Sequence, residues 1–104
     1  MINSVIDISH HQGPNVDFGK VKAAGVVGVI HKATAGTNYK DPMYAGNRQR
    51  ALAAGLLWGA YHWGTGDASG ADQAQYFIAN MVAVLVIELL EVPEIEKQQC
   101  KRAA

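Results

Sequence analysis

The chain has 104 residues, with nine basic and nine acidic side chains and no net formal charge. Single domains usually contain about 100 to 200 residues, so the chain has room for one domain at most. Its hydrophobic share of 49% and charged share of 17% are ordinary for globular proteins and exclude collagen-like and wholly disordered chains. A nucleic-acid partner is not expected, because proteins that bind DNA or RNA usually carry an excess of positive charge.

The cysteine content and the longest apolar run further limit the class of protein to which the chain can belong. Cys100 is the only cysteine, so an internal disulfide is impossible. The residues after Met1 lack the basic region, apolar region and cleavage site of a secretory signal peptide. We therefore expect synthesis in the cytoplasm without such a signal. The run from Met81 to Ile87 is too short to span a bilayer, and membrane insertion is not expected.

Four apolar runs of strand length alternate with segments that have helical patterns. Each run is nearly continuous in aliphatic residues, as in parallel strands that are buried on both faces. The expected strands are Ser4 to Ile8, Val26 to Ile30, Leu56 to Tyr61 and Val82 to Ile87. This alternation is typical of a parallel sheet built from βαβ units.

Three helices are expected between these strands. The first covers about Asp17 to Ala24, with Asp17 as its N-cap, and the second begins after Asp41 and runs to Ala54. Each is followed by a glycine, in an Ala-Ala-Gly sequence that recurs thirty positions later. The third covers about Ala71 to Met81, and its helical spacing predicts an apolar stripe toward the sheet, formed by Ala74, Phe77, Ile78 and Met81.

Polar side chains follow each expected strand where its apolar run ends. They are Asp7 and Ser9, His31 and Lys32, Tyr61 and His62, and Glu88. The carboxyl ends of parallel strands meet at one rim, which carries the active site in (β/α) barrels. We therefore expect a partial (β/α) TIM-like barrel of about four parallel strands and three helices, which is too few strands to close.

The end of the chain has a different composition. Residues 1–87 contain five Asp and no Glu, whereas residues 88–104 contain four Glu and no Asp. We expect a partial catalytic domain over residues 1–90 and a divergent charged tail over 91–104. This pattern fits a barrel interrupted after its fourth strand, and a functional tail with its own composition is the alternative.

Three sequence motifs occur in a fixed order. They are Val5-Ile6-Asp7-Ile8-Ser9-His10-His11-Gln12-Gly13, then Lys32-Ala33-Thr34-Ala35-Gly36-Thr37-Asn38-Tyr39 with Asp41-Pro42, and Gly59-Ala60-Tyr61-His62-Trp63. On these motifs the chain resembles the N-terminal half of glycoside hydrolase family 25 lysozymes, which are N-acetylmuramidases. The resemblance implies hydrolysis of the β-1,4 bond between N-acetylmuramic acid and N-acetylglucosamine in peptidoglycan. It implies no metal or organic cofactor, a glycan partner, and action on the cell wall or outside the cell.

The resemblance also suggests site residues. Glycoside hydrolysis needs a carboxylic acid that protonates the leaving oxygen and a second carboxylate. Asp7 matches the acidic residue of the family's first strand, and Tyr61 matches an aromatic residue of its third. His62, Trp63 and Lys32 complete the expected substrate-binding group, while Glu88 and Glu91 are the other candidate catalytic residues.

The sequence departs from the family at the catalytic acid. The family ends its fourth strand with Asp-x-Glu, whereas this chain has Glu88 at the Asp position and Leu90 at the Glu position. In a strand, residues 88 and 90 would project together and residue 91 oppositely, so Glu91 could substitute only through a β-bulge. Ala35 also occupies a position where the family usually has a Glu.

Each candidate has a simpler alternative. Asp7 could be a turn or capping residue, Glu88 an ordinary acid at a strand end, and Lys32 either a hydrogen-bonding residue or the partner of Asp7 or Glu88. His10, His11, His31 and His62 could form a metal cluster, but their spacing matches no metal motif and ordinary histidines are the expectation. Trp58 and Trp63 differ in phase, which predicts Trp63 on a sugar-binding face and Trp58 beneath a helix.

Three functions remain open at this level. The first is a muramidase, and the second is a catalytically inactive remnant or glycan-binding fragment, which the leucine at position 90 favours. The third is self-association of two half-barrels, because unpaired strand edges expose backbone groups that another chain can satisfy.

Overall fold

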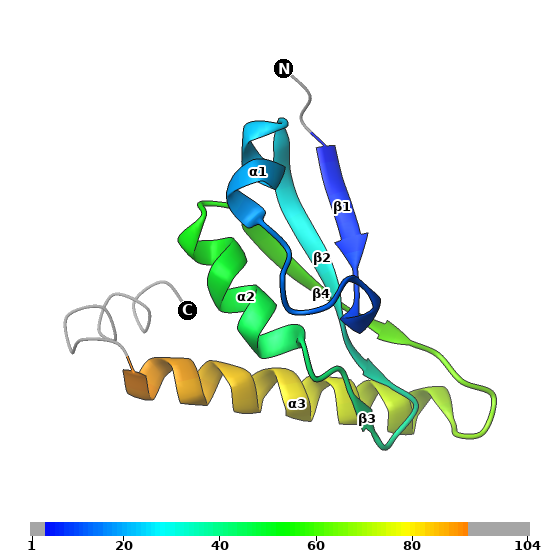
Figure 1. Ribbon diagram of the computed structural model, residues 1–104. Coiled ribbons are helices and arrows are strands. Elements are labelled where there is room, and N and C mark those ends of the chain that lie inside the picture. The colour runs from blue at the N-terminus through cyan, green and yellow to red at the C-terminus, as the bar shows by residue number, and fades with distance from the viewer. Residues whose placement is uncertain (1–3, 92–104) are drawn as a thin grey trace.

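The computed structural model describes residues 4–91, and within the last helix it describes side chains up to Met81. These residues form a mixed α/β fold with one sheet of four strands and three α-helices (Figure 1). The elements are β1 (Ser4–Ile8), a 3₁₀ turn η1 (His10–Gln12), α1 (Phe18–Ala23), β2 (Val26–Ala35), β3 (Tyr39–Lys40), α2 (Tyr44–Ala53), β4 (Leu57–Trp63) and α3 (Gly70–Glu91).

β2 is the central strand of the sheet. Its residues from Gly28 to His31 pair in parallel with β1 and also with β4, so these two strands lie on opposite sides of it. The short β3 pairs antiparallel with the last two residues of β2, at Thr34 and Ala35. The three long strands are therefore parallel, as expected from the sequence, and β3 is an addition that the sequence did not predict.

One face of the sheet is covered by helices and contains the core. Strand residues on this face include Ile8 and Val29, which pack with Phe18 from α1 and Ala51 from α2. Val29 and Ala51 are almost fully buried. Burial of these aliphatic and aromatic side chains holds α1 and α2 against the sheet.

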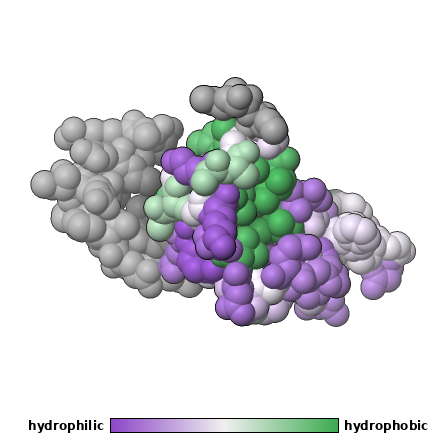
Figure 2. All heavy atoms as spheres, turned by 45° about the horizontal axis from the view of Figure 1, so that its top comes forward, coloured by the Kyte–Doolittle hydropathy of each residue, from purple (hydrophilic) through white to green (hydrophobic). Residues whose placement is uncertain are grey.

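The opposite face of the sheet is uncovered in the described part of the chain, and we call it the open face. Strand alternation and register place on it Val5, Asp7, Gly28, Ile30, Lys32, Leu57, Gly59, Tyr61 and Trp63. Its apolar members are unusually exposed, with Leu57 at 72% and Val5 at 57%. Figure 2 shows a patch of hydrophobic atoms gathered on one face of the molecule. A groove of about 490 Å³ lies at the amino ends of β2 and β4, lined by Val26, Val27 and Leu57 among others.

The predicted helix ends are confirmed at three positions. The Asp17 side chain accepts a hydrogen bond from the Lys20 backbone N–H at 3.1 Å and so caps α1. Gly25 and Gly55, with φ of 100° and 86°, follow α1 and α2 in backbone conformations that favour glycine. Asp41 lies three residues before α2 begins and caps the preceding turn through the Met43 N–H at 2.9 Å.

The predicted fourth strand, Val82 to Ile87, is wrong, because these residues continue α3 to Glu91. A short apolar run rich in valine does not by itself distinguish a strand from a buried helix segment. No glycine or proline interrupts the chain between Ala71 and Glu91, so nothing in the sequence stops a helix that has begun at Gly70. The predicted tail lies outside the described residues, apart from Glu91.

The predicted apolar stripe of α3 is only partly right. Phe77 is half-buried and packs edge-on against the His62 ring, at 6.1 Å between centroids. Ala74 is exposed, however, and Ile78 is 59% exposed, whereas the polar Gln73 is buried. Over residues 4–91, no helix is long and apolar enough to cross a membrane.

Candidate functional site

Asp7 and Tyr61 lie on the open face near the carboxyl ends of β1 and β4. Asp7 is level with Ile30 of β2, and Tyr61 is level with Lys32 two residues further along the same strand. Burial raises the pKa of the Tyr61 phenol, and the negative charges of Asp7 and then Asp41 raise it further. The structure thus brings together the two residues predicted from the first and third motifs.

Lys32 and Trp63 extend this group along the rim. The Lys32 ammonium nitrogen lies 5.2 Å from the centroid of the Trp63 ring and 5.9 Å from that of Tyr39. These are cation–π distances. Among the described side chains, no ion pair joins Lys32 to Asp7, so Lys32 contacts aromatic rings instead of the carboxylate partner considered for it. Trp63 is 59% exposed and presents an apolar ring to solvent.

His62 faces the other side of the sheet from Tyr61 and Trp63. Its Nε2 donates to the Gln73 Oε1 at 2.9 Å, and its Nδ1 lies 2.7 Å from the Thr34 hydroxyl. Gln73 also bonds to both backbone groups of Thr65 and to the Ala68 carbonyl, which fixes the loop between β4 and α3. His62 is therefore outside the open-face group, and its contacts are those of a side chain that holds β4 to α3.

His31 is not a rim residue, because β2 continues past it to Ala35 and its ring points into the helix-covered face. The side chain is fully buried. Its Nδ1 donates to the Lys32 carbonyl at 2.7 Å, and its Nε2 accepts from the Asn47 amide at 3.0 Å. It stacks on Trp58, whose Nε1 donates to the Tyr44 hydroxyl at 3.0 Å, so Trp58 does pack beneath a helix as predicted.

Glu88 and Glu91 lie in the last turns of α3 and not at the end of a strand. In Figure 1 the C-terminal end of α3 lies on the opposite side of α2 from β1. Residues 88, 90 and 91 belong to a helix, so the two-residue alternation expected for a strand does not apply to them. Among the side chains that the structure describes, Asp7 is the one carboxylate on the open face.

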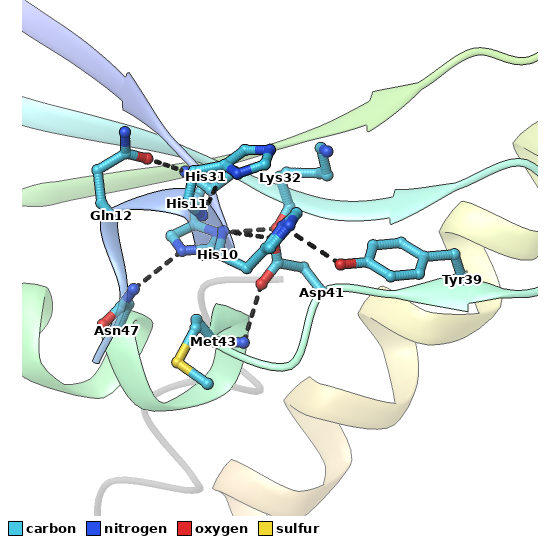
Figure 3. A network of polar contacts seen from close by, with 10 residues as sticks. His10, His11, Gln12, His31, Lys32, Tyr39, Asp41, Met43 and Asn47 are labelled. Carbon is cyan, nitrogen blue, oxygen red and sulfur yellow. Dashed lines mark hydrogen bonds and ion pairs between the residues drawn. The ribbon is translucent and has the colours of Figure 1, made fainter.

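A polar network around Asp41 was not predicted as part of a site (Figure 3). The Asp41 carboxylate is fully buried and accepts from the His10 backbone N–H at 2.8 Å, with the His10 ring Nδ1 at 3.2 Å. The Tyr39 hydroxyl lies 3.2 Å from the same ring nitrogen. The sequence signal was the Asp41-Pro42 pair, which was interpreted as a helix start and as part of the second family motif, without a role in the site.

The histidines do not gather into a metal site in the described part of the chain. Among residues 4–91, no group of three His, Cys, Asp or Glu side chains could hold a metal ion. His31 and His62 have hydrogen-bond partners at both ring nitrogens, and the His10 and His11 rings lie against each other at an angle of 36°, with 4.1 Å between centroids.

Replacing Asp7 with Asn is expected to lower the pKa of Tyr61 toward its usual value of about 10. The Asp7 charge disfavours the nearby phenolate, and an amide has no charge, so part of the increase should disappear. Absorbance of the phenolate during an alkaline titration measures the change, with Tyr61→Phe used to assign the signal. An unchanged Tyr61 titration would mean that the two side chains do not interact.

Comparison with known proteins gives a consistent assignment. The family model for glycosyl hydrolases family 25 matches residues 6–104. Lysozyme M1 of Streptomyces globisporus is 46% identical over 76 residues, covering 72% of this chain and 26% of that protein. An N,O-diacetylmuramidase of a Chalaropsis species is 41% identical over 78 residues, covering 71% of this chain and 36% of that protein. This chain therefore spans about a quarter to a third of the length of these relatives.

Solved structures agree with the sequence comparison. A muramidase from Trichobolus zukalii superposes with a TM-score of 0.70 at 38% identity, over 75% of this chain and 38% of that one. A lysozyme from Streptomyces coelicolor gives a TM-score of 0.69 at 41% identity, over 76% of this chain and 37% of that one. By sequence motif, family model and backbone arrangement together, the chain belongs to glycosyl hydrolases family 25.

Proposed function

We propose that this chain is the N-terminal part of a muramidase that hydrolyses the β-1,4 bond between N-acetylmuramic acid and N-acetylglucosamine in peptidoglycan, at the cell wall or outside the cell. The observation that supports this most directly is the placement of Asp7, Lys32, Tyr61 and Trp63 on one face, near the carboxyl ends of three neighbouring parallel strands. Barrel enzymes build their active sites at that rim. The similar proteins named lysozyme and muramidase favour the same reaction.

The open-face residues have distinct roles in this proposal. Asp7 supplies a carboxylate that stabilises the positive charge developing at the anomeric carbon or sets the ionisation of a partner acid. The exposed Trp63 ring packs against a sugar ring, and the Tyr61 hydroxyl and Lys32 ammonium group bind its polar substituents. A second carboxyl group is still required, and it must come from chain beyond the described side chains.

A closed (β/α) barrel is part of the proposal. An apolar sheet face as exposed as Leu57 and Val5 usually marks a surface that another part of a protein covers. The chain covers 38% or less of the two structures compared above, so most of such a barrel would lie in the remaining part. In a complete barrel the open face becomes the interior, with Asp7 and Tyr61 at its upper rim.

The test is the formation of new muramic-acid reducing ends. The purified chain is incubated with peptidoglycan, and the products are reduced and analysed by mass spectrometry. New ends at muramic acid support the muramidase proposal. Their absence from a sample with the circular dichroism of a folded α/β protein would rule out hydrolysis by this chain alone.

Glycan binding without cleavage is the second candidate. It is favoured by the single carboxylate on the described open face, since hydrolysis by this family needs two. Retention of the chain on insoluble peptidoglycan, without new reducing ends, would support this candidate. Loss of retention in Trp63→Ala would then locate the binding surface on the open face.

We expect the isolated chain to associate with a second copy of itself, which would bury the open face. β1 and β4 are the outer strands of the parallel sheet, and within residues 4–91 no strand pairs with their outer edges, which adds backbone groups to the exposed apolar residues. We expect a mass above that of one chain in sedimentation analysis at micromolar concentration. Leu57→Lys should shift the protein toward the monomer, because it places a charge on this face.

Leu52→Lys is the matched control for this experiment. Leu52 is 43% exposed but lies on α2, away from the open face. An equal shift in both variants, or a monomeric parent chain, would contradict association through the open face.

A further inference from the structure

A buried carboxylate lies directly behind an exposed imidazole at the end of β1. The Asp41 side chain is fully buried, whereas the His10 side chain is 33% exposed. One oxygen, Oδ2, accepts from the His10 backbone N–H at 2.8 Å and lies 3.2 Å from the His10 Nδ1. The other oxygen accepts from the Met43 N–H at 2.9 Å (Figure 3).

The contact with Asp41 favours one tautomer of His10. An ionised carboxylate only accepts hydrogen bonds, so it pairs with Nδ1 when that nitrogen carries the proton, and the Tyr39 hydroxyl at 3.2 Å from the same nitrogen then takes part as an acceptor. In the neutral ring, Nε2 then has no proton and keeps its lone pair as an acceptor. The Tyr39 oxygen approaches Nδ1 and not Nε2, and no other described residue bonds to Nε2.

The contact between the Asp41 carboxylate and the His10 ring is not needed to hold the local backbone, because other hydrogen bonds already hold it. η1 already has a capping box, in which Ser9 accepts from the His11 N–H and Gln12 accepts from the Ser9 N–H. Asp41 also binds the backbone N–H groups of His10 and Met43, which joins this turn to the start of α2. Its further contact with the imidazole orients a side chain that faces solvent.

His10 continues the aromatic surface that begins at Trp63. Lys32 lies over both the Trp63 and the Tyr39 rings. The Tyr39 ring in turn meets the His10 ring edge-on, at 6.0 Å between centroids. Side chains from β4, β2, β3 and η1 are thus in contact along the rim, with His10 at the end opposite Trp63.

We propose that His10 is a further saccharide-contacting residue, whose Nε2 accepts a hydrogen bond from a hydroxyl or acetamido N–H of an N-acetylated sugar, and that Asp41 is the positioning residue that holds the imidazole in this tautomer. The inference rests on the proposed function, because it extends the glycan surface from Trp63 and Lys32 across Tyr39. It adds a neutral hydrogen-bond acceptor to a rim whose other described side chains are the Asp7 carboxylate, a cation, two phenols and an indole.

The experiment uses the full chain with ¹⁵N-labelled histidine and tryptophan. Long-range ¹H–¹⁵N correlation spectra at pH 8 report the tautomer of His10, and titration with N-acetylglucosamine tetramer reports contact. We expect a protonated Nδ1 in the free protein and shifts at the His10 Nε2 and the Trp63 indole on titration. Asp41→Asn should mix the tautomers and weaken binding by about tenfold, the size of one lost hydrogen bond.

The control is Asp72→Asn, which changes an exposed side chain on α3 that has no contact with His10 and should leave affinity within about twofold. His10→Gln tests the same contact without disturbing Asp41, and it should weaken binding while leaving the Trp63 shift in place. A shift at Trp63 without one at His10 would overturn this inference alone. If neither Trp63 nor His10 changes its chemical shift on titration, both the proposed glycan site and this inference are refuted. A proton on the His10 Nε2 in the free chain would refute the role of Asp41.

Discussion

Replacing His31 with Ala is expected to lower the free energy of unfolding by about 3 to 5 kcal/mol, the cost of truncating a large buried ring. His31 is fully buried in the helix-covered face and stacks on Trp58 at 5.5 Å between centroids. Whole domains have stabilities of only about 5 to 15 kcal/mol, so the variant should be close to unfolding.

Packing and hydrogen bonding both contribute to this loss. The alanine leaves a cavity against Trp58 and Tyr44, and it also removes the partners of the Lys32 carbonyl and of the Asn47 amide. His31→Phe separates the two effects, because it keeps a ring of similar size but leaves both polar groups unpaired. We expect that variant to lose about 1 to 3 kcal/mol.

Urea denaturation followed by tryptophan fluorescence measures these changes. His11→Ala is the matched control, since His11 is exposed and its replacement should alter stability by no more than about 0.5 kcal/mol. Similar stabilities for His31→Ala and His11→Ala would contradict the buried position of His31.

Replacing Asp7 with Asn is expected to reduce the formation of muramic-acid reducing ends by about a hundredfold or more. An amide of nearly the same size cannot ionise, so it can neither stabilise positive charge at the anomeric carbon nor influence a partner acid. Retention on peptidoglycan should change little, because Trp63, Tyr61 and Lys32 remain. Mass spectrometry of reduced products measures cleavage, and a pull-down with insoluble peptidoglycan measures retention.

The control for this change is Asp72→Asn. Asp72 is an exposed carboxylate in the first turn of α3, away from the open face, so its variant should cleave at the parent rate. Equal rates in the parent chain and Asp7→Asn would exclude Asp7 from the reaction. An equal loss in both variants would point to a general effect of charge.

Local sequence signals predicted the first half of the fold well. β1 has the predicted bounds, and α1 and α2 end at the two Ala-Ala-Gly sequences, because glycine tolerates the positive φ that follows each helix. The prediction failed at residues 82–87. There a valine-rich run satisfied the pattern of a strand, while the absence of a helix-breaking residue let α3 continue.

Strand alternation decides which of the predicted site residues share a face. Asp7, Tyr61 and Trp63 share a face because paired strands in register place them there, and the phase difference between Trp58 and Trp63 gave the correct opposite faces. The same alternation puts His62 opposite Tyr61, yet the motif resemblance grouped the two residues. Gln73 could not be identified as buried, because its polar group is satisfied by contacts formed only in the folded loop.

The sequence by itself determined the family, the three parallel strands and the opposite faces of Trp58 and Trp63, since these depend on residue type, short spacing and the two-residue period of a strand. Only the tertiary structure decided the helical course of residues 82–91, the burial of His31 and the pairing of Asp41 with His10. The last two join residues far apart in the chain, 16 positions for His31 and Asn47 and 31 for His10 and Asp41. Such contacts depend on how strands and loops pack together, which no local pattern specifies.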